Sequence, residues 1–178
     1  MNSGQTLLTF GALILLTITI LNFNKTLSYH DISLSQNRYK LEAISILTSY
    51  IEQTSQYFFD EATTDTSSGK DLPDFTPPAN LGFDANDNGV IDDFDDFNNY
   101  TVIDTGISGL AYKINFDVAY VQLNNGQLLP SSSKQYSKMM TIKITDNYSE
   151  PLLFKYVNGE KVRDTLQISY VNTYWFYD

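Results

Sequence analysis

The first 68 residues constrain the fold most strongly. Residues 2–24 contain no charged side chain, and residues 7–21 are almost wholly aliphatic. Residues 12–68 contain neither Gly nor Pro, so nothing in this stretch breaks a helix. We therefore predict one long helix, with its first part in lipid or a protein core and its second part packed on a domain.

The uncharged run is long enough to cross a bilayer, which takes roughly 20 apolar residues in a helix. A secretory signal peptide carries a basic segment before its apolar core and small residues at a cleavage site after it. Residues 1–5 contain no basic side chain, and no such small-residue pattern follows residue 21. We therefore expect a retained membrane anchor rather than a conventional cleaved signal peptide.

The helical pattern continues beyond the apolar run. Apolar or weakly polar side chains recur at three- and four-residue steps, which predicts an amphipathic helix. They are Ala43, Leu47, Tyr50, Thr54 and Phe58. A helix from Gln5 to Ala62 would be roughly 85 Å long at 1.5 Å per residue, with the polar residues 30–37 allowing a bend. No small domain can bury that length, so the protruding part must lie in lipid or among copies of itself.

The net charge of −10 over 178 residues argues against a nucleic-acid partner, which would need a basic face. The acidity is local: six Asp residues fall at positions 84–96, a stretch without Lys or Arg. The chain has no Cys, which excludes disulfides, thiolate metal sites and a Cys nucleophile. The charge pattern therefore indicates one cation-attracting site.

The acidic stretch has the spacing of a calcium-binding loop. Calcium takes six to eight oxygen ligands, and alternate positions of a tight turn converge on one point. The predicted ligands are Asp84, Asn86, Asn88, the Val90 carbonyl, Asp92 and Asp95, with Gly89 at the reversal. The pattern resembles dockerin-type and bacterial EF-hand-like loops, which accept Asp at the last position. This resemblance implies bound Ca²⁺ with a structural role; the alternative is a solvated Asp/Asn turn.

Residues from 101 onward show the period-two alternation of strands. One predicted inner face holds Tyr112, Ile114, Phe116, Val118 and Tyr120, and the next strand, 138–145, turns Met140, Ile142 and Ile144 inward. Asn-Gly pairs at 125–126 and 158–159 predict tight hairpins, with 152–157 and 161–171 flanking the second. Leu166, Ile168 and Tyr170 form the inner face of the last strand.

These patterns predict an α+β fold, a long N-terminal helix packed on a C-terminal antiparallel sheet with the calcium loop between them. We divide the chain into an apolar helical segment (1–28), its amphipathic continuation (29–62), a linker with the acidic loop (63–100) and a sheet domain (101–178). We interpret the thirteen Tyr and eleven Phe residues as strand core and subunit interface rather than as a ligand-stacking surface.

Taken together, these features resemble a type IV pilin or pseudopilin. Residues 1–4, Met-Asn-Ser-Gly, match a short leader ending in Gly, and Gln-Thr-Leu-Leu-Thr-Phe follows at residues 5–10. The resemblance implies cleavage between Gly4 and Gln5 by a prepilin peptidase. Two features depart from the family: Thr9 stands where a Glu is usual, and the leader lacks a basic residue.

The function implied by the resemblance is that of a structural filament subunit. It would reside in the inner membrane as a precursor and then, through the assembly machinery, join a helical homo-oligomer at the cell surface. The residues expected to drive assembly are Leu7, Leu8, Phe10, Leu13, Ile14, Leu16, Ile18, Ile20 and Leu21. The alternative is a monomeric, membrane-tethered calcium-binding module with an adhesive role.

We expect no enzymatic activity. His30 is the only histidine and lies away from the acidic cluster. The sequence contains no H-E-x-x-H, no G-x-S-x-G and no phosphate-binding Gly loop.

Overall fold

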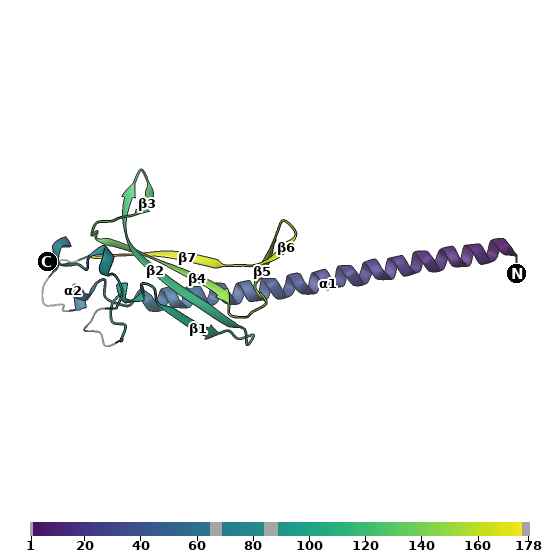
Figure 1. Cartoon of the computed structure of the whole chain (residues 1–178), viewed down its shortest axis with the longest axis horizontal. Helices are drawn as coiled ribbons and strands as arrows, with labels where there is room; N and C mark the ends of the chain where they lie inside the picture. The colour runs from purple at the N-terminus through teal and green to yellow at the C-terminus, as the bar shows by residue number, and fades with distance from the viewer. Residues whose placement is uncertain (1, 65–68, 84–88, 176–178) are drawn as a thin grey trace. The chain divides into compact units, whose positions relative to one another are not determined.

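The computed structural model describes residues 2–64, 69–83 and 89–175. By its internal contacts the chain divides into two units, Met1–Arg38 and Tyr39–Asp178, and helix α1 (Ser3–Thr54) contributes to both. The remaining elements belong to the second unit (Figure 1). They are α2 (Glu61–Thr64), the 3₁₀ turns η1 (Leu72–Asp74), η2 (Pro78–Asn80) and η3 (Asp95–Phe97), and the strands β1 (Thr101–Thr105), β2 (Ala111–Asn124), β3 (Gln127–Pro130), β4 (Ser137–Asp146), β5 (Phe154–Val157), β6 (Glu160–Arg163) and β7 (Leu166–Thr173).

Helix α1 confirms the predicted long helix but ends earlier than expected. It passes through residues 30–37 without interruption, so no bend interrupts it there, and it stops at Thr54 rather than Ala62. The hydroxyls of Thr54 and Ser55 donate to the carbonyls of Ile51 and Glu52 in its last turn, as other hydroxyls do within the helix. Beyond them, the Phe58 carbonyl accepts the N–H of Phe94 at 2.8 Å. Phe94 belongs to the acidic segment, residues 89–97, and it takes the carbonyl that would accept the N–H of residue 62 in a longer helix.

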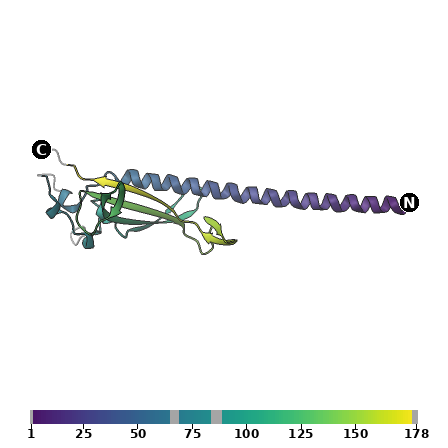
Figure 2. The ribbon, with the colours of Figure 1, turned by 90° about the horizontal axis from the view of Figure 1, so that it is seen from above.

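The strands form the predicted antiparallel sheet. Its order is β1-β2-β4-β7, with β3 paired to the far end of β2, while β5 and β6 form a separate two-stranded sheet. Figures 1 and 2 show the last turns of α1 lying along one face of the sheet. The fold is therefore α+β, with the C-terminal part of the long helix packed on an antiparallel sheet.

The predicted inner faces are confirmed. All eight inward residues predicted on β2 and β4 are at most 5% exposed, and Leu166, Ile168 and Tyr170 of β7 pack against the same core. Helix α1 adds Ala43 and Leu47, and the acidic segment adds Phe94 and Phe97. Burying this many large side chains, each worth about 1.5–3 kcal/mol, is what holds helix, acidic segment and sheet together.

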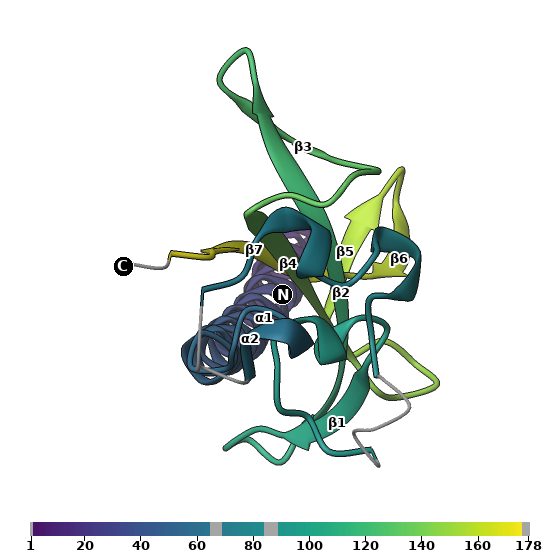
Figure 3. The ribbon, with the colours of Figure 1, turned by 90° about the vertical axis from the view of Figure 1, so that its left-hand side faces the viewer.

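Both predicted hairpin turns are present. Asn125 and Gly126 have φ of 49° and 78°, and Asn158 and Gly159 have φ of 52° and 86°, as a two-residue turn with positive φ requires. The first turn closes a two-stranded ribbon of β2 and β3 that extends away from the rest of the domain (Figure 3). The second joins β5 to β6.

One predicted strand, 161–171, is in fact two. It is interrupted at Asp164, whose N–H donates to the Leu153 carbonyl at 2.9 Å. The Asp164 carboxylate pairs with Lys40 of α1 at 2.8 Å and with Lys155 of β5 at 3.2 Å. Burial alone would raise the pKa of Asp164, but the hydrogen bonds and charges of the two lysines outweigh it and lower the pKa. These pairs attach the β5–β6 hairpin to the helix.

A second attachment fixes the β1–β2 turn on α1. The Glu42 carboxylate accepts hydrogen bonds from the Ser108 N–H at 2.7 Å, the Ser108 hydroxyl at 2.5 Å and the Tyr112 hydroxyl at 2.9 Å. Gly106 leaves the room that this carboxylate occupies, since a Cβ there would lie 2.3 Å from Glu42 Cδ. Burial and the bond to Glu42 both raise the pKa of Tyr112.

We predict that Gly106→Ala destabilises the protein by about 1–3 kcal/mol, because the new methyl group displaces the Glu42 carboxylate from its donors. The measurement is chemical unfolding of the full chain in detergent. Glu42→Ala is the matched background: there the methyl group has nothing to displace, so Gly106→Ala should cost much less. Equal costs in the two backgrounds would contradict this account of the turn.

Candidate functional site

The first candidate site is the apolar stretch of α1 within Met1–Arg38. Its most apolar 18-residue window has a mean hydropathy of 2.1 and no buried residue, so by length and composition this helix can cross a membrane. All nine predicted assembly residues are exposed in the single chain: Leu7, Leu8, Phe10, Leu13, Ile14, Leu16, Ile18, Ile20 and Leu21. A helix that is apolar on every side requires a dry surrounding, either lipid or other helices.

The few polar groups of this stretch are satisfied within the helix. The hydroxyls of Thr9, Thr17 and Thr19 donate to the carbonyls of Thr6, Leu13 and Leu15, each at 2.8 Å. Side chains bonded in this way can enter an apolar medium without losing hydrogen bonds. The surface also has a shallow apolar groove at Gly4 and Gly11, lined by Leu7, Leu8, Ala12 and Leu15. Gly4 and Gln5, the predicted processing pair, lie in the first turn of α1.

The second candidate site is the acidic part of the chain. Residues 60–96 contain eleven of the 21 acidic residues and only one of the eleven basic ones, Lys70. This segment therefore accounts for the entire net charge of −10, and the rest of the chain is neutral overall. Such a local excess of negative charge requires cations, supplied either by the protein or by the solvent.

The structure describes half of the predicted calcium ligands. Val90 and Asp92 are exposed, and the Asp92 N–H donates to Asp96 Oδ2 at 3.0 Å. Asp95 is buried, and its Oδ1 accepts a short hydrogen bond from Lys138. Asp84, Asn86 and Asn88 lie outside the described residues. Among the residues described, no three His, Asp or Glu side chains are placed to hold a metal ion. The calcium site therefore stays a prediction.

Lys138, which no sequence motif singled out, is the most unusual group of the domain. Its side chain is fully buried at the start of β4. Its ammonium donates to Asp60 Oδ2 at 2.6 Å, to Asp95 Oδ1 and to the Phe59 carbonyl at 2.9 Å. It also lies 4.6 Å from the centre of the Phe59 ring and 5.2 Å from that of Tyr120. The period-two alternation of this strand does indicate that Lys138 is buried, because Lys138 shares the inward face of Met140, Ile142 and Ile144.

Asp60 is the most heavily bonded carboxylate of this cluster. Its oxygens accept from the Thr76 N–H at 3.0 and 3.1 Å, the Thr76 hydroxyl at 3.2 Å and the Tyr120 hydroxyl at 3.2 Å, besides Lys138. Burial, followed by the charge of Asp60, raises the pKa of Tyr120, so this hydroxyl stays a donor. Asp60 thereby joins the chain after α1 to β2, to β4 and to the loop containing Thr76.

Asp93 is a further buried carboxylate of this cluster. It is 2% exposed, and its Oδ1 accepts the N–H groups of Asp95 at 2.8 Å and Asp96 at 3.0 Å, at the start of η3. Burial, reinforced by the charge of Asp95, raises the pKa of Asp93 to about 8. Burial also raises the pKa of Asp95, to about 6, against the opposing charge of Lys138. One cation thus does not compensate all the carboxylates gathered here.

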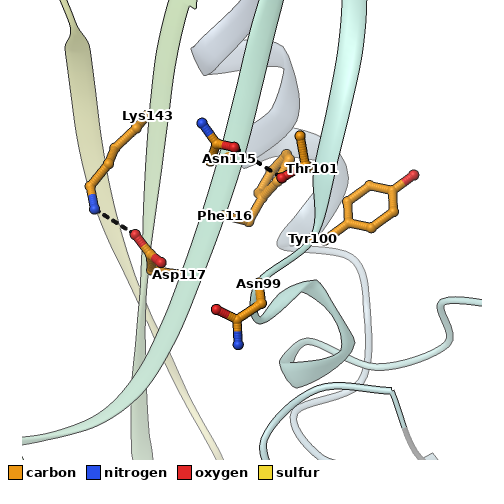
Figure 4. Close-up of a pocket in the computed structure, with 7 residues that line it drawn as sticks. All are labelled: Asn99, Tyr100, Thr101, Asn115, Phe116, Asp117 and Lys143. Atoms are coloured by element: carbon orange, nitrogen blue, oxygen red, sulfur yellow. Dashed lines mark hydrogen bonds and ion pairs between the residues drawn. The ribbon is translucent and has the colours of Figure 1, made fainter.

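A third location is a shallow polar hollow on the sheet (Figure 4), at the junction of β1, β2 and β4. Two pairs of its polar side chains are bonded: the Thr101 hydroxyl donates to Asn115 Oδ1 at 2.9 Å, and Lys143 donates to Asp117 Oδ2 at 2.6 Å. The Lys143–Asp117 pair is about half exposed on both sides. Four of the polar side chains that line the hollow are therefore bonded in pairs.

Comparisons with known proteins identify no relative. No family model matches the chain, no curated protein is similar to it, and no solved structure matches its fold.

We predict that the free energy of unfolding falls as the pH rises from about 4 to 8 in calcium-free buffer. Between these pH values Asp93 is mostly protonated in the folded protein and mostly ionised in the unfolded chain, so the folded state binds more protons. One such group contributes a slope of at most about 1.4 kcal/mol per pH unit. Asp93→Asn keeps the acceptor oxygen but cannot ionise, and should flatten the curve.

The matched control for this prediction is Asp117→Asn, which changes an exposed carboxylate and should leave the slope in place. Urea unfolding at several pH values measures both variants. A slope that is unchanged in Asp93→Asn would show that the pKa of Asp93 is not raised in the folded protein.

Proposed function

We propose that this protein is a structural subunit of a type IV pilin-like filament or pseudopilus, assembled through its N-terminal helix. The observation that carries the proposal is the apolar stretch of α1, whose nine large side chains are exposed, followed by a domain with a core of its own. A subunit drawn from a membrane into a fibre needs both parts. The α+β architecture of the chain agrees with this proposal.

The same helix surface serves both locations. In the inner membrane, lipid tails surround the apolar side chains; in the fibre, the helices of other subunits replace them. Lipid and packed helices are about equally apolar, so the transfer exposes little apolar surface to water, and close packing decides assembly. The groove at Gly4 and Gly11 would let a second helix approach closely. Cleavage after Gly4 by a prepilin peptidase would leave Gln5 as the new N-terminus.

Calcium would stabilise the folded domain of the subunit, Tyr39–Asp178. We propose that Asp84, Asn86, Asn88, the Val90 carbonyl and Asp92 hold the ion, with Asp95 joining them only where Lys138 releases it. The support is the spacing of these residues and the concentration of the net charge in residues 60–96. Bound Ca²⁺ would offset the repulsion among carboxylates that Lys138 leaves uncompensated.

The competing function is a monomeric calcium-binding or adhesive module that the helix tethers to the membrane. Thr9 in place of the usual Glu favours this alternative. The two functions differ in self-association, which is the property to measure.

We expect electron microscopy of sheared surface material to show fibres that contain this chain, with Gln5 as the N-terminus by mass spectrometry. Gly11→Leu should reduce the fibres and leave membrane insertion unchanged, because it keeps the helix apolar but fills the groove. Leu16→Ile, which conserves volume, is the control. An intact monomer that remains in the membrane fraction would contradict the filament and favour the tether.

We also expect Ca²⁺ to raise the thermal unfolding temperature of the full chain in detergent, and chelator to reverse the rise. Binding to the folded state alone stabilises it by mass action. The double variant Asp84→Asn with Asp92→Asn should lose most of this response, whereas Asp117→Asn should retain it. A calcium response that is absent in the unmodified chain would exclude the site.

A further inference from the structure

We propose that Lys138 and Asp60 form an intramolecular isopeptide bond after the domain folds, with Asp95 carrying the protons. The three groups come from distant parts of the chain and meet in its interior. The Lys138 nitrogen lies 2.6 Å from Asp60 Oδ2 and within hydrogen-bond distance of Asp95 Oδ1. Lys138 and Asp60 supply a nucleophile and an electrophile in contact, the near-attack arrangement that replaces a bimolecular encounter.

The donors around Asp60 make it the electrophile. When an amine adds to a carboxyl carbon, negative charge grows on the carboxyl oxygens, and positioned donors stabilise that charge. The Thr76 N–H donates to both Asp60 oxygens, at 3.1 and 3.0 Å, and the Thr76 hydroxyl donates at 3.2 Å. The Tyr120 hydroxyl lies 3.2 Å from Asp60 Oδ2 and also bonds to the Thr76 carbonyl at 2.8 Å. Asp95 contacts the same nitrogen, which places it to take protons from it.

Burial favours the reaction. Lys138, Asp60 and Asp95 are 0%, 1% and 2% exposed, and the rings of Phe59 and Tyr120 cover the lysine. In water an ammonium and a carboxylate are far more stable as separate ions than as an amide. In a dry interior both ions lose their hydration, so a product without charge is favoured relative to the pair. The water released leaves the site.

The bond is made without any other reactant. Asp95 takes a proton from the ammonium, and the resulting amine attacks Asp60 Cγ and forms the C–N bond. Asp95 then delivers that proton, and a second one from the nitrogen, to one Asp60 oxygen. The C–O bond breaks, one water leaves, and Asp95 returns to its starting state. One positive and one negative charge disappear together, so the net charge of the chain does not change.

The bond would join two parts of the domain that otherwise only pack together. Asp60 follows the end of α1, and Lys138 begins β4 in the middle of the sheet. The chain contains no Cys, so it has no disulfide to hold these parts under force. A covalent link between residues 60 and 138 would keep the sheet attached to the helical half of the subunit. This inference does not depend on the filament proposal.

Mass spectrometry of the purified full chain tests the bond directly. After trypsin digestion, we expect one branched species in which residues 41–70 are joined to residues 135–143, lighter by one water than the sum of the two peptides. Cleavage after Lys138 should be absent, because an acylated lysine is not a trypsin site. Working at the peptide level keeps the result independent of any processing at Gly4.

Two variants and a matched control complete the test. Lys138→Arg keeps a cation but lacks the amine nucleophile, and Asp95→Asn keeps an acceptor but cannot carry protons; both should yield unlinked peptides. Lys143→Arg is the control, because Lys143 and Asp117 are also 2.6 Å apart but lie at the surface (Figure 4). This control should retain the Lys138 link.

The proposal is overturned if the unmodified protein gives free peptides 41–70 and 135–138 in full yield. It is also overturned if the branched species persists in Lys138→Arg. Should Lys138→Arg fail to fold, Asp95→Asn decides the role of the proton carrier, and the spectrum of the unmodified protein still decides whether the bond exists.

Discussion

In its ion-paired form, Lys138 is the cation on which the packing of unit Tyr39–Asp178 depends. Residues 60–96 place Asp60 and Asp95 against the sheet, where water cannot reach them, and the lysine is the group that binds both. Removing one partner of such a buried pair typically costs about 3–5 kcal/mol, because the other charge remains without compensation. Through Asp60 and Asp95, the segment that follows α1, the turn η3 and strand β4 all meet at this one amine.

The two units of the chain place their apolar side chains in opposite environments. In Tyr39–Asp178, apolar side chains are buried in a core, and the buried charges are bonded to one another. In Met1–Arg38, apolar side chains are exposed and the threonine hydroxyls are bonded inside the helix. The first arrangement suits water and the second suits a dry medium, which is why we propose a membrane origin and a fibre core for the apolar helix.

Much of the fold could be predicted because its signals are periodic. Alternation along 112–120 and 140–144 identified the inner faces of β2 and β4, and the Asn-Gly pairs identified both hairpins. The end of α1 could not be found in this way, since no Gly or Pro marks it; the backbone pairing of Phe58 with the acidic segment decides it. The break between β6 and β7 likewise lies at Asp164, whose N–H bonds to the Leu153 carbonyl and whose carboxylate bonds to Lys40, a residue distant in sequence.

The long helix, its uncharged first part, the antiparallel sheet and the concentration of acid at 60–96 all follow from local periodicity or composition, so they can be predicted from the sequence. Which acids are buried, and what they contact, depends on the folded structure. The sequence predicts Asp95 to be a calcium ligand, yet in the structure it is bonded to an amine 43 residues away. A charge's partner depends on which segments pack together, and that packing is a property of the whole core rather than of any one segment.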